Sequence, residues 1–318
     1  MNIAALLREP FRAMGTACVV CITARPADIG QARGVLAAAI AEIRACEGVL
    51  SRFEPGSDLS RLNSVSGDWL TVDVRLVEAL GEAIRARVET AGRYDPTILP
   101  VLVAAGYDRS FEKLLVRSPV ALSGWRAGGR IDIDREHGRA RLEAGVGVDL
   151  GGIGKGFAAS RALAAIRREW PGAPGALIDL GGDIAVSGSP PEGGPWRVAI
   201  ADPRSRDGIV GTMALSDRAV ATSGRDVRRF GPGLHHLIDP STGAVSQAGP
   251  LAVTVVAARP VEAEAHATAL AICDPVDIFG YLSDRPQLAA MLVPEDGDAI
   301  TIGNLPFIET RQLAEVRP

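Results

Sequence analysis

The stretch that decides the fold is Val148-Asp149-Leu150-Gly151-Gly152-Ile153-Gly154-Lys155-Gly156-Phe157. An apolar segment from Val146 predicts a strand that runs into these glycines, and the residues that follow predict a helix as far as Trp170. Four glycines in six positions leave few side chains in the way of a ligand, so backbone N–H groups and a helix N-terminus can approach an anion closely. The alternative is a tight strand-to-helix turn whose glycines serve backbone geometry alone.

The spacing of these glycines matches neither the dinucleotide-binding fingerprint nor the P-loop. A second observation favours a phosphate-binding loop. The chain contains only two lysines, and one of them, Lys155, lies inside the glycine stretch. The sequence therefore predicts a loop at which backbone donors and one ammonium group meet an anionic ligand.

The composition indicates a globular protein of one or two domains. The chain has 318 residues, 47% of them hydrophobic, and a formal net charge of -4. Arginines are dispersed among acidic residues, so no nucleic-acid partner is predicted. No stretch approaches the roughly 20 apolar residues of a membrane span, and residues 1–14 lack the apolar region and cleavage site of an export signal. We expect a cytoplasmic protein with no membrane span.

The cysteine pattern gives no metal or redox site. Cys18 and Cys21 form a Cys-x-x-Cys, but residues 16–22 predict a strand. Residues three apart on a strand point to opposite faces, so we expect two buried apolar side chains.

Two amphipathic helices are predicted early in the chain. The first opens with Asp28 as its N-cap and continues to about Leu50, and the second covers about residues 75–90. Residues 51–63 predict a polar connection with one aromatic residue, Phe53. A long connection of this composition is often functional or disordered.

A turn between two prolines follows the second helix. Pro96 and Pro100 stop a continuing helix and hold Tyr94, Asp95 and Thr97 in a defined loop. From the residues alone, an Asx turn closed by Asp95 and contact of Asp95 with a ligand are both open.

Further strands are predicted along the second half of the chain. Residues 176–186 predict one apolar strand interrupted by Gly181-Gly182, where the backbone approaches another group closely. Residues 196–201 and 219–224 predict two more strands, and the latter ends on Ser223 and a glycine, as at a pocket rim or an ordinary turn.

Two candidate sites of chemistry lie near the C-terminal end. His235 and His236 adjoin an Asp-Pro turn, and because alternation sends them to opposite faces, at most one reaches a given site as a base. In a predicted helix over residues 261–272, Glu264 and Thr268 lie on one face among alanines. This pair suits a hard cation such as Mg²⁺, and the alternative is a solvated helix face.

The order of these motifs resembles the ApbE family, the FAD:protein FMN transferases. The resemblance extends from about Met14 to Ile272 and rests on motifs in consistent order. These are Met14-Gly15-Thr16, Ser51-Arg52-Phe53, Ser57-x-x-Ser60-Arg61-Leu62-Asn63, Asp95-Pro96-Thr97-x-x-Pro100, Asp149-Leu150-Gly151-Gly152-Ile153-x-Lys155-Gly156, Leu180-Gly181-Gly182-Asp183, Ala221-Thr222-Ser223-Gly224, His236-x-x-Asp239-Pro240-x-Thr242-Gly243 and Glu264-x-x-x-Thr268.

The resemblance implies a mixed α/β chain of the α+β type, in which residues 1–318 form a single domain of two intimately packed lobes with FAD in the cleft. It also implies a Mg²⁺-dependent enzyme that moves FMN from FAD to a Thr or Ser hydroxyl of an acceptor flavoprotein and releases AMP. Two alternatives are an FAD pyrophosphatase that gives FMN and AMP, and a non-catalytic flavin-binding protein.

By the same resemblance, three groups of residues receive roles. His236 is the candidate base, and the metal is held by the carbonyl of Gly152 with Glu264 and Thr268. Glu264 stands where the family usually has Asp, and Phe53 where Tyr is common. The residues expected to line FAD are Met14, Phe53, Tyr94, Asp95, Asp149 and Lys155, with Arg93, Ser223 and Leu237 as their motif neighbours.

Overall fold

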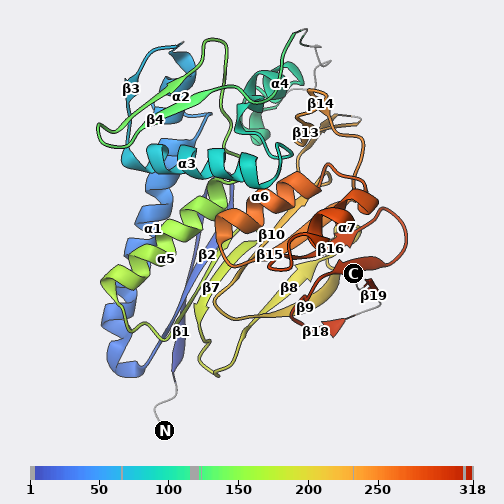
Figure 1. The fold of residues 1–318 in the computed structure, drawn as a ribbon. Helices are drawn as coiled ribbons and strands as arrows, with labels where there is room; N and C mark the ends of the chain where they lie inside the picture. Colours follow the sequence, from blue (N-terminus) through green and yellow to red (C-terminus); the bar gives the residue numbers. More distant parts are fainter. Residues whose placement is uncertain are drawn as a thin grey trace.

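A computed structural model describes residues 4–65, 67–114, 122, 124–231, 233–310 and 313–316. Its centre is one large sheet (Figure 1). All neighbouring strands are antiparallel except the last two, which are parallel. In the described part of the chain the spatial order is β1 (Ala5–Ala13), β2 (Thr16–Ala24), β6 (Gly175–Leu180), β7 (Asp183–Gly188), β10 (Ala219–Gly224), β15 (Ala252–Ala257), β16 (Ala289–Val293), β17 (Ala299–Ile302) and β19 (Leu313–Val316).

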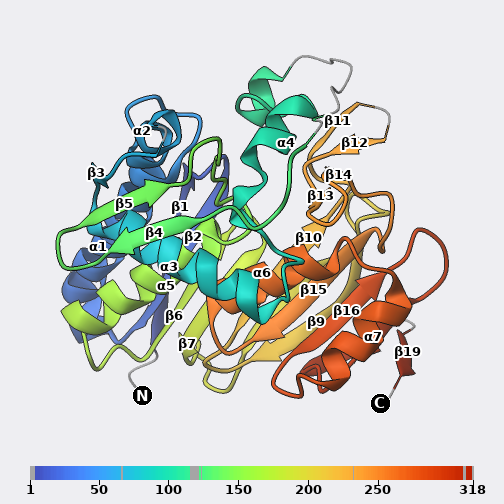
Figure 2. The same ribbon diagram turned by 45° about the horizontal axis from the view of Figure 1, so that its top comes forward.

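Helices cover one face of this sheet and a smaller sheet covers part of the other (Figures 1 and 2). The covering helices are α1 (Ile29–Leu50), α5 (Gly154–Glu169) and α6 (Pro260–Leu270), with α7 (Pro275–Ser283) beside β16. On the far face, β18 (Phe307–Thr310), β9 (Ile209–Leu215) and β8 (Trp196–Ala201) pair in that order. This layering of helices on a large sheet confirms the expected mixed α/β fold class of the α+β type.

Smaller elements gather at one end of the large sheet, at the top of Figure 1. The helix α3 (Val74–Glu89) contacts α1, α5 and α6. The other elements at this end are α2 (Asp58–Ser64), β3 (Leu70–Thr71), η2 (Pro96–Ile98), α4 (Leu99–Ala104), η3 (Phe111–Lys113), β4 (Ile131–Asp134), β5 (Arg139–Leu142), β11 (Arg229–Gly231), β12 (Leu234–His235), β13 (Ile238–Asp239) and β14 (Ala244–Val245). The short η1 (Pro26–Asp28) joins β2 to α1.

The first predicted helix is confirmed, but its cap differs. Ala32, Leu36, Ile40 and Ile43 are buried at three- and four-residue steps, as an amphipathic helix requires. The Asp28 side chain makes no capping hydrogen bond, because its carboxylate accepts from Arg25 Nε at 2.7 Å. A short 3-10 turn at Pro26–Asp28 opens the helix instead.

Two predictions, one of a connection and one of a strand, are wrong. Residues 51–63 contain the helix α2, whose N-cap Ser57 accepts from the backbone of Ser60. The predicted single strand over 176–186 is a hairpin of β6 and β7, in which Leu180 pairs with Asp183. Gly181 and Gly182 have φ of +72° and +95°, which a two-residue hairpin turn of this kind requires.

The N-terminal hairpin contains a strand that the sequence reading missed. Residues 5–13 form β1, which pairs with β2 along its whole length. Met14 and Gly15 form the turn, with φ of +53° and +69°. Both Cys18 and Cys21 are buried on β2, as expected from its alternation.

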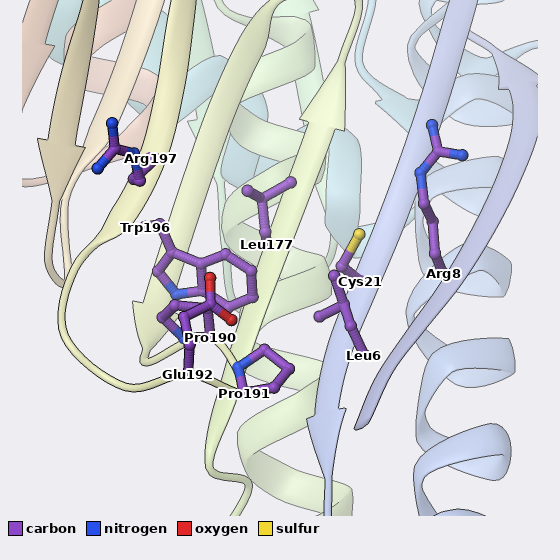
Figure 3. Close-up of a pocket in the computed structure, with 9 residues that line it drawn as sticks. All are labelled: Leu6, Arg8, Cys21, Leu177, Pro190, Pro191, Glu192, Trp196 and Arg197. Carbon is purple, nitrogen blue, oxygen red and sulfur yellow. The ribbon is translucent and has the colours of Figure 1, made fainter. Parts of the chain in front are cut away.

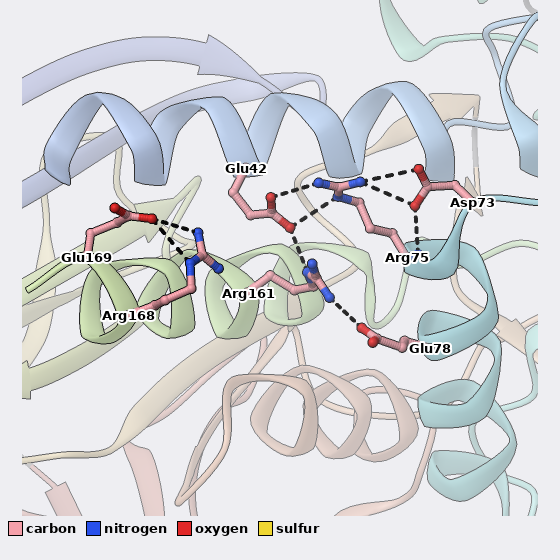
Figure 4. A network of polar contacts seen from close by, with 7 residues as sticks. All are labelled: Glu42, Asp73, Arg75, Glu78, Arg161, Arg168 and Glu169. Atoms are coloured by element: carbon pink, nitrogen blue, oxygen red, sulfur yellow. Dashed lines mark hydrogen bonds and ion pairs between the residues drawn. The ribbon is translucent and has the colours of Figure 1, made fainter. Parts of the chain in front are cut away.

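A network of charges joins three helices (Figure 4). Glu42 on α1 accepts from Arg75 on α3 at 2.9 Å and from Arg161 on α5 at 2.6 Å. Arg161 also reaches Glu78 on α3 at 2.5 Å. The hydrogen bond from Arg75 lowers the pKa of Glu42, outweighing the effect of partial burial. The network thus fixes the layer of helices above the sheet.

Among the described residues, no helix is both long and apolar enough to cross a membrane.

Candidate functional site

The glycine loop is held in place by side-chain and backbone contacts rather than by a sheet. Val148 donates to Asn63 Oδ1 at 2.7 Å and accepts from Asn63 Nδ2 at 2.8 Å, while the Asp149 N–H donates to the carbonyl of Pro96. The expected strand from Val146 is therefore wrong, because these contacts take the place of a ladder. The expected helix is confirmed as α5, which begins at Gly154.

The first turn of α5 lies against α6. An ideal Cβ on Gly156 would lie 2.5 Å from the carbonyl oxygen of Pro260 and 2.8 Å from the nitrogen of Val261. Only glycine permits this approach. It lets the N–H of Gly156 donate to Glu264 Oε2 at 2.7 Å, so the loop and α6 meet at one carboxylate.

Lys155 joins three elements at the same place. Its Nζ donates to Glu264 Oε1 on α6 at 2.6 Å and forms an ion pair with Asp183 at the start of β7. The other oxygen of Asp183 accepts from the N–H of Thr222 on β10 at 3.1 Å. Burial alone would lower the pKa of Lys155, but Asp183 and Glu264 more than offset it and raise that pKa. Lys155 is therefore a half-buried ammonium group that keeps its charge at neutral pH.

The three residues expected to hold a metal lie together. Glu264 is buried, and Thr268, one turn further on α6, is half-buried and within 3.2 Å of Ser223 Oγ. An ideal Cβ on Gly152 would lie 3.0 Å from Thr268 Oγ1 and 2.9 Å from the ring of Tyr94, so the backbone of Gly152 packs directly against the hydroxyl.

The carbonyl of Gly152, the carboxylate of Glu264 and the hydroxyl of Thr268 fit Mg²⁺, which prefers oxygen ligands. A carboxylate offers about four lone-pair sites, and two contacts are recorded for Glu264, from Lys155 and from Gly156. In the described part of the chain no three His, Cys, Asp or Glu side chains converge to hold a metal. A cation here would thus depend on the carbonyl of Gly152 and the hydroxyl of Thr268.

His236 is half-buried, and its Nδ1 has no hydrogen-bond partner among the described residues. Burial, and after it the charge of Arg228, lower its pKa to about 3, while a hydrogen bond to the backbone of Arg228 opposes this shift. The ring is therefore neutral at physiological pH. His235 is buried, and its Nδ1 accepts from the N–H of Leu237 at 3.3 Å, so it serves the local backbone.

Three other expected FAD residues surround the loop. The ring of Tyr94 is buried, its hydroxyl has no hydrogen-bond partner among the described residues, and burial raises its pKa. The methyl group of Met14 lies 3.6 Å from an ideal Cβ on Gly154. Asp149 Oδ1 accepts from the N–H of Gly151 at 2.7 Å.

The structure gives the remaining four expected residues other contacts. The ring centroid of Phe53 lies 5.8 Å from that of Tyr107. Asp95 accepts from the N–H and hydroxyl of Thr97 at 2.8 and 2.7 Å and from the N–H of Gly128, which favours the Asx-turn interpretation. Arg93 lies over the ring of Tyr281. Leu237 is buried in the core.

Sequence reasoning missed Asp183 and Arg52. Asp183 reaches Lys155 only because Gly181-Gly182 turns the chain into β7, and reading those glycines as a hairpin turn would have found it. Arg52 pairs with Asp149, a contact between distant segments that no local pattern indicates.

Two cavities lie away from these residues. One, of about 310 Å³, lies on the sheet face opposite α1 and α5 (Figure 3). The other, of about 420 Å³, lies near the ends of α3 and α7. The residues that line the first are Leu6, Arg8, Cys21, Leu177, Pro190, Pro191, Glu192, Trp196 and Arg197, and those of the second are Glu89, Glu262, His266, Asp284, Arg285 and Gln287.

Comparison with known proteins relates this arrangement to one family. Residues 14–292 match the model of the ApbE family. The chain belongs to the ApbE family. A FAD:protein FMN transferase of Klebsiella pneumoniae is 25% identical over 300 residues, which cover 91% of this chain and 85% of that protein. A FAD:protein FMN transferase of Treponema pallidum is 28% identical over 320 residues, which cover 92% of this chain and 86% of that protein.

Solved ApbE structures share the fold. The crystal structure of the ApbE protein from Thermotoga maritima matches with a TM-score of 0.79 and 25% identity, covering 93% of this chain and 96% of that one. The flavin transferase ApbE from Vibrio cholerae matches with a TM-score of 0.76 and 22% identity, over 96% of this chain and all of that one. This ApbE chain therefore has the fold of both.

Proposed function

We propose that this protein transfers FMN from FAD to a Thr or Ser hydroxyl of an acceptor flavoprotein and releases AMP. The observation that carries the proposal is the meeting of the glycine loop with the Lys155–Glu264 pair, near enough to a neutral His236 for the charge of Lys155 to lower its pKa, in a chain of the ApbE family. Relatives along most of its length are named FAD:protein FMN transferases.

The reaction needs positioning and charge neutralisation more than covalent help from the protein. The acceptor hydroxyl oxygen bonds to the FMN phosphorus of FAD, and the bond from that phosphorus to the bridging oxygen breaks, so that AMP leaves with the bridging oxygen. Lys155 supplies one positive charge beside the loop, in which the N–H groups of Gly151 and Gly156 already have acceptors within the protein. Mg²⁺, held by the Gly152 carbonyl, Glu264 and Thr268, would neutralise phosphate charge as a Lewis acid.

His236 takes the proton of the acceptor hydroxyl on Nδ1. This nitrogen has no partner in the described part of the chain, and the lowered pKa keeps the ring neutral and able to accept a proton. Lys155 is one of the charges that lower this pKa. An anionic pyrophosphate beside Lys155 offsets that charge and strengthens the base once FAD is bound.

The test is to incubate the protein with FAD, Mg²⁺ and a candidate acceptor. General-base help is worth about 10²–10⁴ in rate, so His236→Ala should bind FAD but lose most transfer. His137→Ala is the control, because that side chain is exposed in the β4–β5 turn. Rapid FMN release without any acceptor would favour FAD hydrolysis instead. The cytoplasmic location stays a prediction, which cell fractionation tests.

A further inference from the structure

Arg52 follows α1 directly, and its side chain is only 5% exposed. Its Nε forms an ion pair with Asp149. The guanidinium lies over two rings, 4.1 Å from the centroid of Phe53 and 4.6 Å from that of Tyr107. One side chain thus joins the segment after α1, the glycine loop and the segment after α4.

One nitrogen of this guanidinium, with its two N–H donors, is unsatisfied. An arginine side chain has five N–H donors, and Arg52 Nη2 is buried with no hydrogen-bond partner within the described residues. A buried donor without an acceptor is unfavourable, and a charged one more so. The two rings fix the guanidinium plane, so Arg52 cannot swing out to water without leaving both. A bound ligand can supply the missing acceptor without moving the guanidinium.

The charge around the loop indicates which kind of acceptor this is. Asp149, Asp183 and Glu264 carry three formal negative charges against the one positive charge of Lys155, and this excess of negative charge would repel an anionic pyrophosphate. Arg52 neutralises Asp149, the residue that closes the turn at Gly151. The same side chain removes a repulsion and leaves a charged donor free, and a charged donor binds an anionic oxygen most strongly.

We propose that Arg52 is an FAD-binding residue whose Nη2 donates to an anionic oxygen of the FAD pyrophosphate while its Nε holds Asp149. The inference rests on the proposed function, because FAD is the ligand. The arrangement also makes Arg52 a positioning residue for the ring of Phe53, against which it packs.

The test measures FAD binding by flavin fluorescence for the parent, Arg52→Gln, Arg52→Lys and a control, Arg168→Gln. Arg168 is an exposed arginine on α5, paired only with its neighbour Glu169 in the described structure. Losing a hydrogen bond to a charged group should raise the Kd for FAD about 10- to 100-fold in Arg52→Gln. Arg52→Lys should recover part of this, because an ammonium keeps the charge but cannot hold two acceptors in one plane. The control should bind as the parent does.

ADP in competition with FAD locates the contact, because ADP carries a pyrophosphate without a flavin. The inference predicts that Arg52→Gln weakens ADP and FAD by similar factors, and unchanged ADP binding would refute it. Thermal unfolding without FAD identifies folding defects, and Arg52→Lys carries the test if Arg52→Gln does not fold. If the parent itself does not bind FAD, the proposed function fails. If the parent binds FAD and both Arg52 variants bind it as tightly as the parent does, the Arg52 inference alone fails.

Discussion

Gly156 lies where the first turn of α5 meets the start of α6, and alanine at this position should destabilise the protein. Two opposed effects decide the sign. Alanine is favoured over glycine in a helix interior by about 1 kcal/mol. The new Cβ, however, would lie 2.5 Å from the carbonyl oxygen of Pro260, and overpacking typically costs about 1–3 kcal/mol.

The steric effect should win because the obstructing atoms belong to the backbone and cannot rotate away. With a cost of about 3 kcal/mol and a helix gain of about 1 kcal/mol, the net loss is about 2 kcal/mol. For a chain of this size that loss lowers Tm by roughly 4 °C. Separating α5 from α6 also lengthens the hydrogen bond from Gly156 to Glu264.

The assay is thermal unfolding of Gly156→Ala beside Gly34→Ala. Gly34 is an exposed glycine inside α1 and an added Cβ there meets nothing within 4 Å. The control should therefore gain about 1 kcal/mol from helix propensity alone. The reasoning is refuted if Gly156→Ala is as stable as the parent or gains stability as Gly34→Ala does.

Three further predictions concern the site and its support. Gly152→Ala should abolish any rise in Tm produced by Mg²⁺, because the added methyl group would lie 3.0 Å from Thr268 Oγ1; an unchanged Mg²⁺ effect would contradict the metal site. Glu42→Gln should cost about 1.5–3 kcal/mol at pH 7. Since Arg75 lowers the pKa of Glu42, this contribution is fully present above the ordinary pKa of a glutamate and is lost as pH falls through the lowered pKa, so the difference in urea unfolding between parent and variant should shrink on acidification. An acid-insensitive difference would count against the network. Because the pKa of His236 is about 3, kcat/KM for transfer should not fall near pH 6.5 on acidification. An inflection near pH 6.5 would argue against His236 as a base with a lowered pKa.

Local patterns predicted the elements that local physics determines. The helix α1 was readable from the spacing of its apolar residues and α6 from its alanine-rich composition, because both signals depend on near neighbours alone. The turn at Gly181-Gly182 was misread because two adjacent glycines fit both a close approach and a hairpin turn. Only pairing with a distant strand decides between them.

The site was predictable only in part for a related reason. The family resemblance brought together Gly152, Glu264 and Thr268; the fold packs Gly152 against Thr268, and Glu264 lies one turn earlier on the same helix. It did not indicate that Lys155 joins Glu264, because an ion pair across 109 positions leaves no periodic signal. The same holds for Asp95, whose Asx turn is completed by a backbone N–H more than thirty residues away.

The central claim is that this protein attaches FMN covalently to another protein. The most direct measurement is a mass spectrum of an acceptor flavoprotein after incubation with FAD, Mg²⁺ and the parent or His236→Ala. The account predicts an FMN-sized increase on a peptide that contains Thr or Ser with the parent, and little or none with the variant. Free FMN and AMP with an acceptor of unchanged mass would contradict it.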